Sequence, residues 1–173
     1  NTGAMRSQRV IEHRTEMSAQ QYIGTATAAE GIAFVAANNM GFVNVSLWAP
    51  FHTATDVGPM SKYVRVAATP TIGDWDIGGG IQWWGGTTGI GSEVEEGGDL
   101  FPAGSYATHA WALDAQAQGS ISAMPLGVYV SYASADKSEA GDPENIFNAA
   151  ADNKTAWALI GELGVIPNKT TVS

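Results

Sequence analysis

The sequence predicts an all-β fold, an antiparallel up-and-down transmembrane β-barrel, from three features. First, the connections between the apparent strands alternate in length: short turns fall at 38–40, 70–74, 118–124 and 164–168, and long polar connections at 18–30, 50–61, 87–106 and 136–153. Second, apolar and polar residues alternate within the segments between these connections. Third, no apolar run approaches the roughly 18 residues of a membrane-spanning helix. Tight turns at one end and long loops at the other are typical of outer-membrane barrels.

Eight strands are expected from the alternation and from the β-branched and aromatic residues. They cover 8–17, 31–38, 41–49, 62–69, 75–86, 107–117, 125–135 and 154–163, and residues 169–173 read as the start of a ninth. In 41–49, for example, Val43, Val45 and Leu47 fall on one face and Asn44 and Ser46 on the other. All seven prolines fall in connections or at strand edges, where the missing N–H removes no ladder bond.

Composition narrows the function classes. The net charge of −9, with only eight Lys and Arg, argues against nucleic acid as a partner. The chain has no cysteine, which excludes disulfides and thiolate chemistry. The three histidines are scattered without metal-ligand spacing, and no nucleophile elbow or phosphate-binding loop is present. We therefore expect no enzyme activity, no catalytic residue, no metal site and no cofactor.

Five tryptophans fall near the ends of the expected strands: Trp48, Trp75, Trp83, Trp111 and Trp157. The indole ring prefers the boundary between membrane and water, where the ring is half buried and its N–H stays hydrated. These residues are therefore predicted to form membrane-interface girdles. The alternative is that they pack in the core of a soluble protein.

If the apolar face of each strand meets lipid, the opposite face lines a lumen. The predicted pore-lining residues are Glu12, Arg14, Glu16, Asn44, Arg65, Asp76, Gln82, Asp114, Gln116 and Glu162. Both signs of charge are present, so a transverse field that sorts hydrated solutes is one expectation. Arg65 and Asp114 are the preferred candidates, as single charges within apolar strands. The alternative is that these side chains only hydrate the wall or pair with one another.

Three stretches, 62–88, 112–136 and 154–173, carry a family resemblance. Each is a strand, a short turn such as Pro-Thr-Ile-Gly-Asp-Trp or Ile-Pro-Asn-Lys, and a returning strand, and each resembles a hairpin of the large single-chain porins of the Gram-negative outer membrane. The resemblance implies an outer-membrane location and a water-filled channel for passive diffusion of small hydrophilic solutes. It also implies lipid and lipopolysaccharide as partners and a homotrimer as the assembly.

Two departures from the porin pattern matter. Porins usually end on a strand with a terminal aromatic residue, and this chain ends at Ser173. Aqueous channels also have more strands, about 16 to 18. The expectation is therefore a single β-barrel domain over 1–173 that is incomplete at its C-terminus, an N-terminal or partial segment of a larger barrel.

Other interpretations stay open at this point. One is a secreted soluble β-sandwich, an adhesin or carbohydrate-binding module, in which Trp83 and Trp84 and the acidic loops form the site. A second is a barrel that sheaths an electron-transfer protein, and a third is a small closed barrel of eight strands without a pore. The face with Leu126, Val128, Val130 and Tyr132 separates the first from the barrels, because it packs in a core in a sandwich and meets lipid in a barrel.

Overall fold

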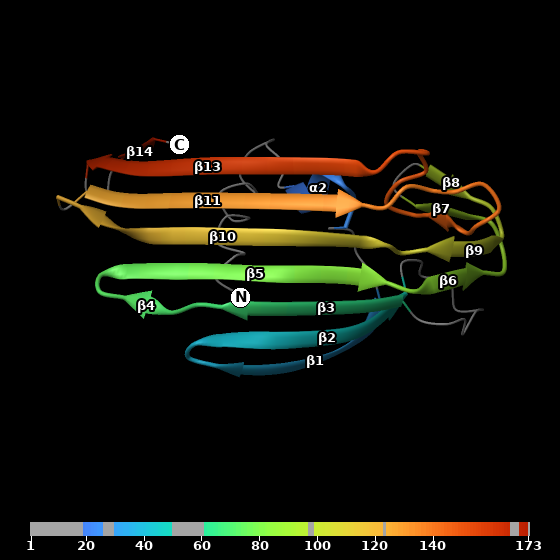
Figure 1. Ribbon diagram of the computed structural model, residues 1–173, viewed down its shortest axis with the longest axis horizontal. Helices are drawn as coiled ribbons and strands as arrows, with labels where there is room; N and C mark the ends of the chain where they lie inside the picture. The colour runs from blue at the N-terminus through green and yellow to red at the C-terminus, as the bar shows by residue number, and fades with distance from the viewer. Residues whose placement is uncertain are drawn as a thin grey trace.

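The computed structural model describes residues 19–25, 30–49, 61–96, 99–122, 124–166 and 170–172, and these form an all-β structure dominated by one antiparallel sheet (Figure 1). Neighbouring strands of this sheet follow in chain order, apart from short strands in the connections. The order is β1 (Glu30–Asn38), β2 (Gly41–Ala49), β3 (Ser61–Ala68), β5 (Trp75–Gly85), β10 (Ala110–Ile121), β11 (Met124–Ala135), β13 (Lys154–Ile166) and β14 (Thr170–Val172), with β4 (Thr71–Ile72) beside β5. The up-and-down antiparallel order is thus confirmed.

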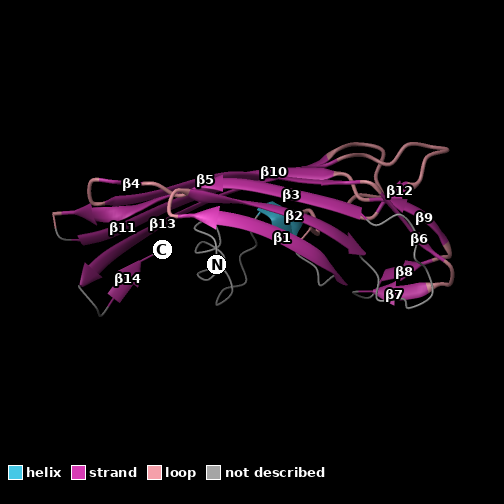
Figure 2. Cartoon of the chain, turned by 90° about the horizontal axis from the view of Figure 1, so that it is seen from below, coloured by secondary structure: helices cyan, strands magenta, loops and turns pink. Residues whose placement is uncertain are grey.

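Within the described residues the sheet is open, so closure into a barrel is not confirmed and stays a prediction. Its path runs from β1 at one edge to β14 at the other, and these two strands do not pair. The sheet is nevertheless strongly curved, with a convex and a concave side (Figure 2). The short helix α2 (Ala19–Tyr22) lies on the concave side. No helix within the described ranges is long and apolar enough to cross a membrane.

The boundaries of two predicted strands need correction. β13 continues to Ile166, three residues beyond the expected end at 163. Ala107 belongs to a different sheet, and the long strand β10 begins at Ala110 and runs to Ile121. The turn expected over 118–124 is therefore much tighter, with Ser122 in the left-handed region at a φ of 49°. The predicted strand over 8–17 lies outside the described residues.

The long connections contain structure of their own. Residues 87–107 form β6 (Thr87–Ile90), β7 (Val94–Glu96), β8 (Asp99–Phe101) and β9 (Gly104–Ala107), and 136–153 contains β12 (Glu144–Asn145). β6 pairs with β9, β9 pairs in parallel with β12, and β7 and β8 form a separate hairpin. All of them lie at the same end of the large sheet (Figure 1). The described residues of these two connections thus form a cap at the long-loop end of the sheet.

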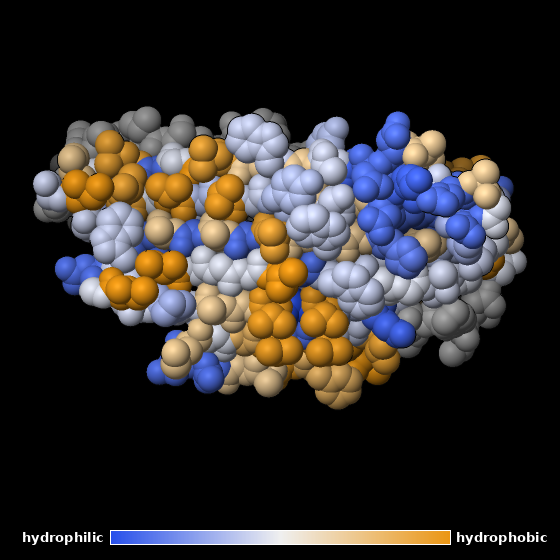
Figure 3. Space-filling view, in the orientation of Figure 1, coloured by the Kyte–Doolittle hydropathy of each residue, from blue (hydrophilic) through white to orange (hydrophobic). Residues whose placement is uncertain are grey.

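The two faces of the large sheet differ in chemistry. Register places most of the exposed apolar side chains of the sheet on one face across seven neighbouring strands, with Val35 of the edge strand β1 as an exception. They are Ile32, Phe34, Val43, Val45, Leu47, Val66, Ile77, Ile81, Trp83, Leu113, Val128, Val130, Tyr132, Trp157 and Leu159. The opposite face carries Ser131, whose hydroxyl meets α2, so the exposed apolar face is the convex one. Figure 3 shows this face, where apolar side chains cover much of the strands and hydrophilic ones gather over the cap.

Glycines in the strands make room for neighbouring side chains. Three consecutive glycines, Gly78–Gly80, lie in the middle of β5. The register of β5 is continuous on both sides, so they mark no bulge, and side chains of the neighbouring strands approach them closely. A Cβ at Gly78 would lie 3.0 Å from Cγ of Gln116, and one at Gly80 would lie 3.4 Å from Nη2 of Arg65. Both side chains reach across β5 at a glycine.

A similar arrangement on the convex face gives a prediction. A Cβ at Gly119 would lie 2.4 Å from the ring of Trp75, whereas a Cβ at Gly161 would meet nothing within 4 Å. Gly119→Ala should therefore lower the free energy of unfolding by about 1–3 kcal/mol, because the ring must leave its position. Gly161→Ala, the matched control, should change it by less than about 0.5 kcal/mol. Urea unfolding followed by tryptophan fluorescence measures both; equal effects would contradict the packing of Trp75 over Gly119.

Candidate functional site: the concave face of the sheet

The concave face carries the predicted lining residues that the structure describes. Register places them on the side of the sheet opposite Val45, Ile81 and Val130: Asn44, Arg65, Asp76, Gln82, Asp114, Gln116 and Glu162. Glu12, Arg14 and Glu16 lie outside the described residues. Alternation in the sequence thus assigned these side chains to a common face, and whether that face lines a pore stays a prediction.

A hydrogen-bonded network connects three strands at the centre of this face. Nη2 of Arg65 on β3 lies 2.9 Å from Oδ2 of Asp114 on β10, and both side chains are buried. Nε2 of Gln82 on β5 donates to Oδ2 of Asp114 at 3.1 Å. The hydroxyl of Tyr63 donates to Oε1 of Gln82 at 3.0 Å, and the Arg65 guanidinium lies 5.7 Å from the ring centroid of Phe42.

This network changes the interpretation of Arg65 and Asp114. The sequence suggested two single charges that could set a field across a lumen. In the structure they form one ion pair on one wall, so their charges largely cancel at a distance. For these two residues the alternative interpretation is confirmed: the lining charges pair with one another.

The other lining residues have weaker local contacts. Asp76 accepts a hydrogen bond from the hydroxyl of Thr71 at 2.9 Å, and Asn44 accepts one from Ser46 at 2.9 Å. The hydroxyl of Tyr129 lies 3.4 Å from Oε2 of Glu162. Asp76 and Glu162 have no cationic partner in any ion pair among the described residues. The carboxylates of Asp76 and Glu162 therefore give the concave face negative charge that no described cation compensates.

The tryptophans fall into two groups. Trp75, Trp83, Trp111 and Trp157 lie on the convex face, as the girdle prediction requires. Trp83 pairs across strands with Trp111, whose ring lies 5.2 Å from that of Tyr132, and Tyr132 pairs with Trp157. These four aromatic residues form a continuous band at the long-loop end of the convex face. Figure 3 shows pale side chains between the apolar strands and the hydrophilic cap.

The girdle prediction for Trp48 needs correction. Trp48 lies on the concave face, is 9% exposed and stacks on Phe147 of the 136–153 loop at 6.2 Å between ring centroids. Trp84, on the same face, packs against Phe147 at 6.5 Å. One position along β2 decides the outcome: Leu47 faces outward and Trp48 inward, so nearness to a strand end alone was misleading.

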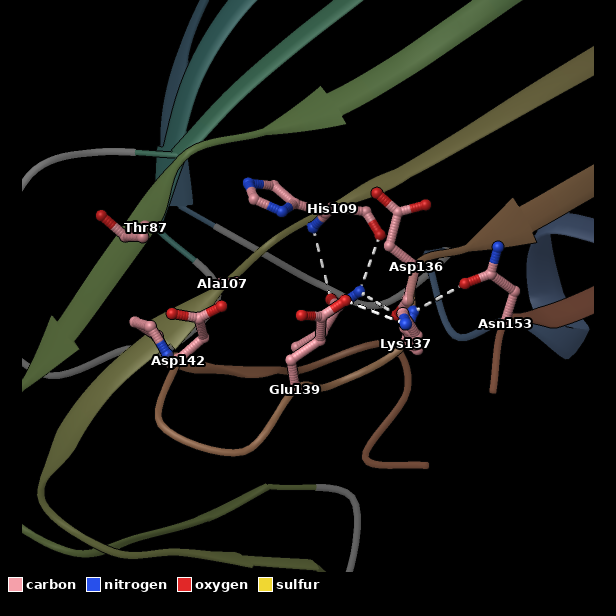
Figure 4. A pocket seen from close by; sticks show the side chains of 10 residues that line it. Thr87, Ala107, His109, Asp136, Lys137, Glu139, Asp142 and Asn153 are labelled. Atoms are coloured by element: carbon pink, nitrogen blue, oxygen red, sulfur yellow. Dashed lines mark hydrogen bonds and ion pairs between the residues drawn. The ribbon is translucent and has the colours of Figure 1, made fainter. Parts of the chain in front are cut away.

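A pocket of about 450 Å³ lies in the cap, between the loop 136–153 and the strand ends. Figure 4 shows the carboxylates of Asp136, Glu139 and Asp142 around it. Nζ of Lys137 lies 2.9 Å from Oε1 of Glu139, and this hydrogen bond raises the pKa of the lysine. Among the described residues no three potential metal ligands gather closely enough to hold an ion.

Sequence reasoning missed the residue that organises this cap. The side chain of Asn145 is buried, and its Nδ2 donates to the backbone oxygens of His109 at 2.8 Å and Asp136 at 2.7 Å. Its Oδ1 accepts from the backbone N–H of His109 and of Phe147 at 3.3 Å each. Asn148 bonds the backbone in a similar way. The only signal was the preference of asparagine for bonding nearby backbone groups in turns.

We predict that Asn145→Ala lowers the free energy of unfolding by about 2–4 kcal/mol, because buried carbonyl oxygens lose their donor. Asn153→Ala is the matched control, since Asn153 makes an exposed bond to the backbone N–H of Lys137 and should cost under about 1 kcal/mol. Urea unfolding with tryptophan fluorescence reports both. Equal costs would show that Asn145 does not organise the cap.

Comparison with known proteins does not identify a family for this chain. No protein-family model matches it, and neither a curated protein nor a solved structure matches it.

Proposed function

We propose that this chain forms part of the wall of an outer-membrane porin, a transmembrane β-barrel through which small hydrophilic solutes diffuse passively. The observation that carries the proposal is the convex face of the sheet, where exposed apolar side chains continue across β1, β2, β3, β5, β10, β11 and β13. Proteins that work in water rarely expose apolar patches above a few hundred Å². A lipid bilayer would cover this face.

Strand length and aromatic placement support a membrane setting. β10 and β11 have 12 residues each and β13 has 13, and a tilted strand needs roughly 9–11 to cross the hydrocarbon layer. The band of Trp83, Trp111, Tyr132 and Trp157 lies where the apolar strands give way to the polar cap. Such a band is typical of the interface between lipid and water. Lipid, and lipopolysaccharide on the loop side, are the partners that we propose for it.

The concave face supports a wet interior. Asp76 and Glu162 carry charge there, and Asn44 adds hydrogen-bonding groups that a channel wall offers to hydrated solutes. No bond is made or broken in this function. The solute would move down its gradient through water.

The soluble sandwich is less well supported. It requires the convex face to pack against a second sheet, yet Val128, Val130 and Tyr132 are 39%, 45% and 38% exposed. In the described part of the chain, the smaller sheets lie at one end and leave the convex face open.

Quenching of tryptophan fluorescence by brominated acyl chains tests the membrane setting. The protein in vesicles of brominated phosphatidylcholine should be quenched, and Trp157→Phe should remove much more of the quenching than Trp84→Phe. Trp157 is 74% exposed on the convex face, whereas Trp84 is buried on the concave face. Absence of quenching would contradict the membrane setting.

Vesicle swelling in isosmotic arabinose then tests the channel. The proposed function predicts swelling with the protein and none without it. Quenching without swelling would leave a membrane wall and contradict diffusion through it.

A further inference from the structure

The concave face is not open along its whole length. Half of it, toward the long-loop end, carries small residues that are almost completely buried: Ala110, Ala112, Ala133 and Ala135. A bare channel wall would leave such side chains wet. In this structure, other segments of the same chain cover them.

Among the described residues, the covering segment nearest the N-terminus is the short stretch 19–25. Backbone bonds from Ile23 to Ala19 at 3.2 Å and from Thr25 to Gln20 at 3.1 Å give it a compact turn, and Gly24, at a φ of 87°, ends it. α2 within it contacts β11 and β13 and lies in the concavity of the sheet (Figure 2). The segment is therefore inside the curve that a barrel would close.

This segment is packed into the face. Ile23 is 0% exposed and Ala19 1% exposed, and both belong to one cluster with the buried alanines and with Trp48, Trp84 and Phe147. The backbone N–H of Ala19 meets the hydroxyl of Ser131 at 3.4 Å, and Nζ of Lys154 lies 5.4 Å from the ring centroid of Tyr22. The alanines give this segment the room that larger side chains would fill.

We propose that residues 19–25 are a built-in plug that occupies the long-loop half of the lumen and sets the size limit for solutes. This inference rests on the proposed function, because a plug restricts flow only inside a channel. The residues of the cluster around Ile23 are almost completely shielded from solvent, so solutes must pass beside it.

Single cysteines test the plug directly, because the natural chain has none. In protein embedded in vesicles, Ala133→Cys should react with a water-soluble maleimide at least about ten-fold more slowly than Ser120→Cys, since thiol reactivity follows exposure. Ala133 is 0% exposed beneath the plug, and Ser120 is exposed on the same concave face near the tight turns. Equal rates would overturn the plug.

Loosening the plug gives a second measurement. Ile23→Ala should speed the labelling of Ala133→Cys several-fold and admit larger sugars in vesicle swelling. Tyr22→Ala, on the exposed side of the same turn, removes only the contact with Lys154 and should have a much smaller effect on both. If labelling of Ala133→Cys stays equally slow when Ile23→Ala is added, Ile23 does not hold the plug in place. Circular dichroism of each variant shows whether the sheet has formed, and Ile23→Val repeats the test with a smaller change in volume.

The two proposals fail separately. If no sugar swells vesicles with the natural protein or with Ile23→Ala, the channel is contradicted. Swelling by the natural protein together with equal labelling at Ala133→Cys and Ser120→Cys contradicts the plug alone.

Discussion

Replacing Asp114 by leucine will lower the free energy of unfolding by about 3–5 kcal/mol, because it leaves the Arg65 guanidinium buried without its counter-ion. The pair connects β3 to β10 across β5, and the variant also removes the acceptor of Gln82. Urea unfolding in detergent micelles, followed by tryptophan fluorescence, measures the loss.

The double variant Arg65→Met with Asp114→Leu separates the pair from the packing around it. Apolar side chains of similar volume often replace a buried ion pair at little cost, so the double variant should be more stable than Asp114→Leu alone. Asp76→Asn is the control for loss of an acid on the same face, since Asp76 is exposed and should cost under about 0.5 kcal/mol. If the single and double variants were equally unstable, the ion pair would not be what connects these strands.

Much of the sheet could be predicted from the sequence, because period-2 alternation is a local property. Val43, Val45 and Leu47 against Asn44 and Ser46 reveal both a strand and its two faces. The boundaries of β10 could not be obtained in this way. Ala107 belongs to β9 and Thr108 bonds the backbone oxygen of Gly86, a contact between residues distant in the sequence that carries no local signal.

For the candidate site, the side of the sheet on which each residue lies could be predicted, but the contacts that each residue makes could not. Alternation assigns Arg65 and Asp114 to the same side of the sheet. Their pairing depends on Gly80, which leaves space for the arginine to cross β5, and on the register of three strands. Trp48 and Phe147 meet only because the loop 136–153 folds inward, and Asn145 holds that loop through bonds to the backbone.

A charge on the convex face should separate a membrane wall from a soluble protein. Val45→Arg, at the middle of β2, should lower the free energy of unfolding in a lipid bilayer by about 2–4 kcal/mol, as expected for arginine facing the middle of the hydrocarbon layer. Asn44→Arg, one residue earlier, points to the concave face and should cost far less in the same bilayer. Folding yield in phosphatidylcholine vesicles over a urea series measures both.

The difference between the stability costs of Val45→Arg and Asn44→Arg is stronger evidence for the membrane setting than either cost alone. Val45 is 44% exposed, so in water an arginine there would desolvate nothing and would leave stability nearly unchanged or improve solubility. In lipid the same arginine must be dehydrated or must reach for the interface. A large penalty at Val45 with a small one at Asn44 therefore requires lipid on the convex face and water on the concave one. The opposite order would place the membrane, or a partner protein, on the wrong side of the sheet and overturn the proposed channel.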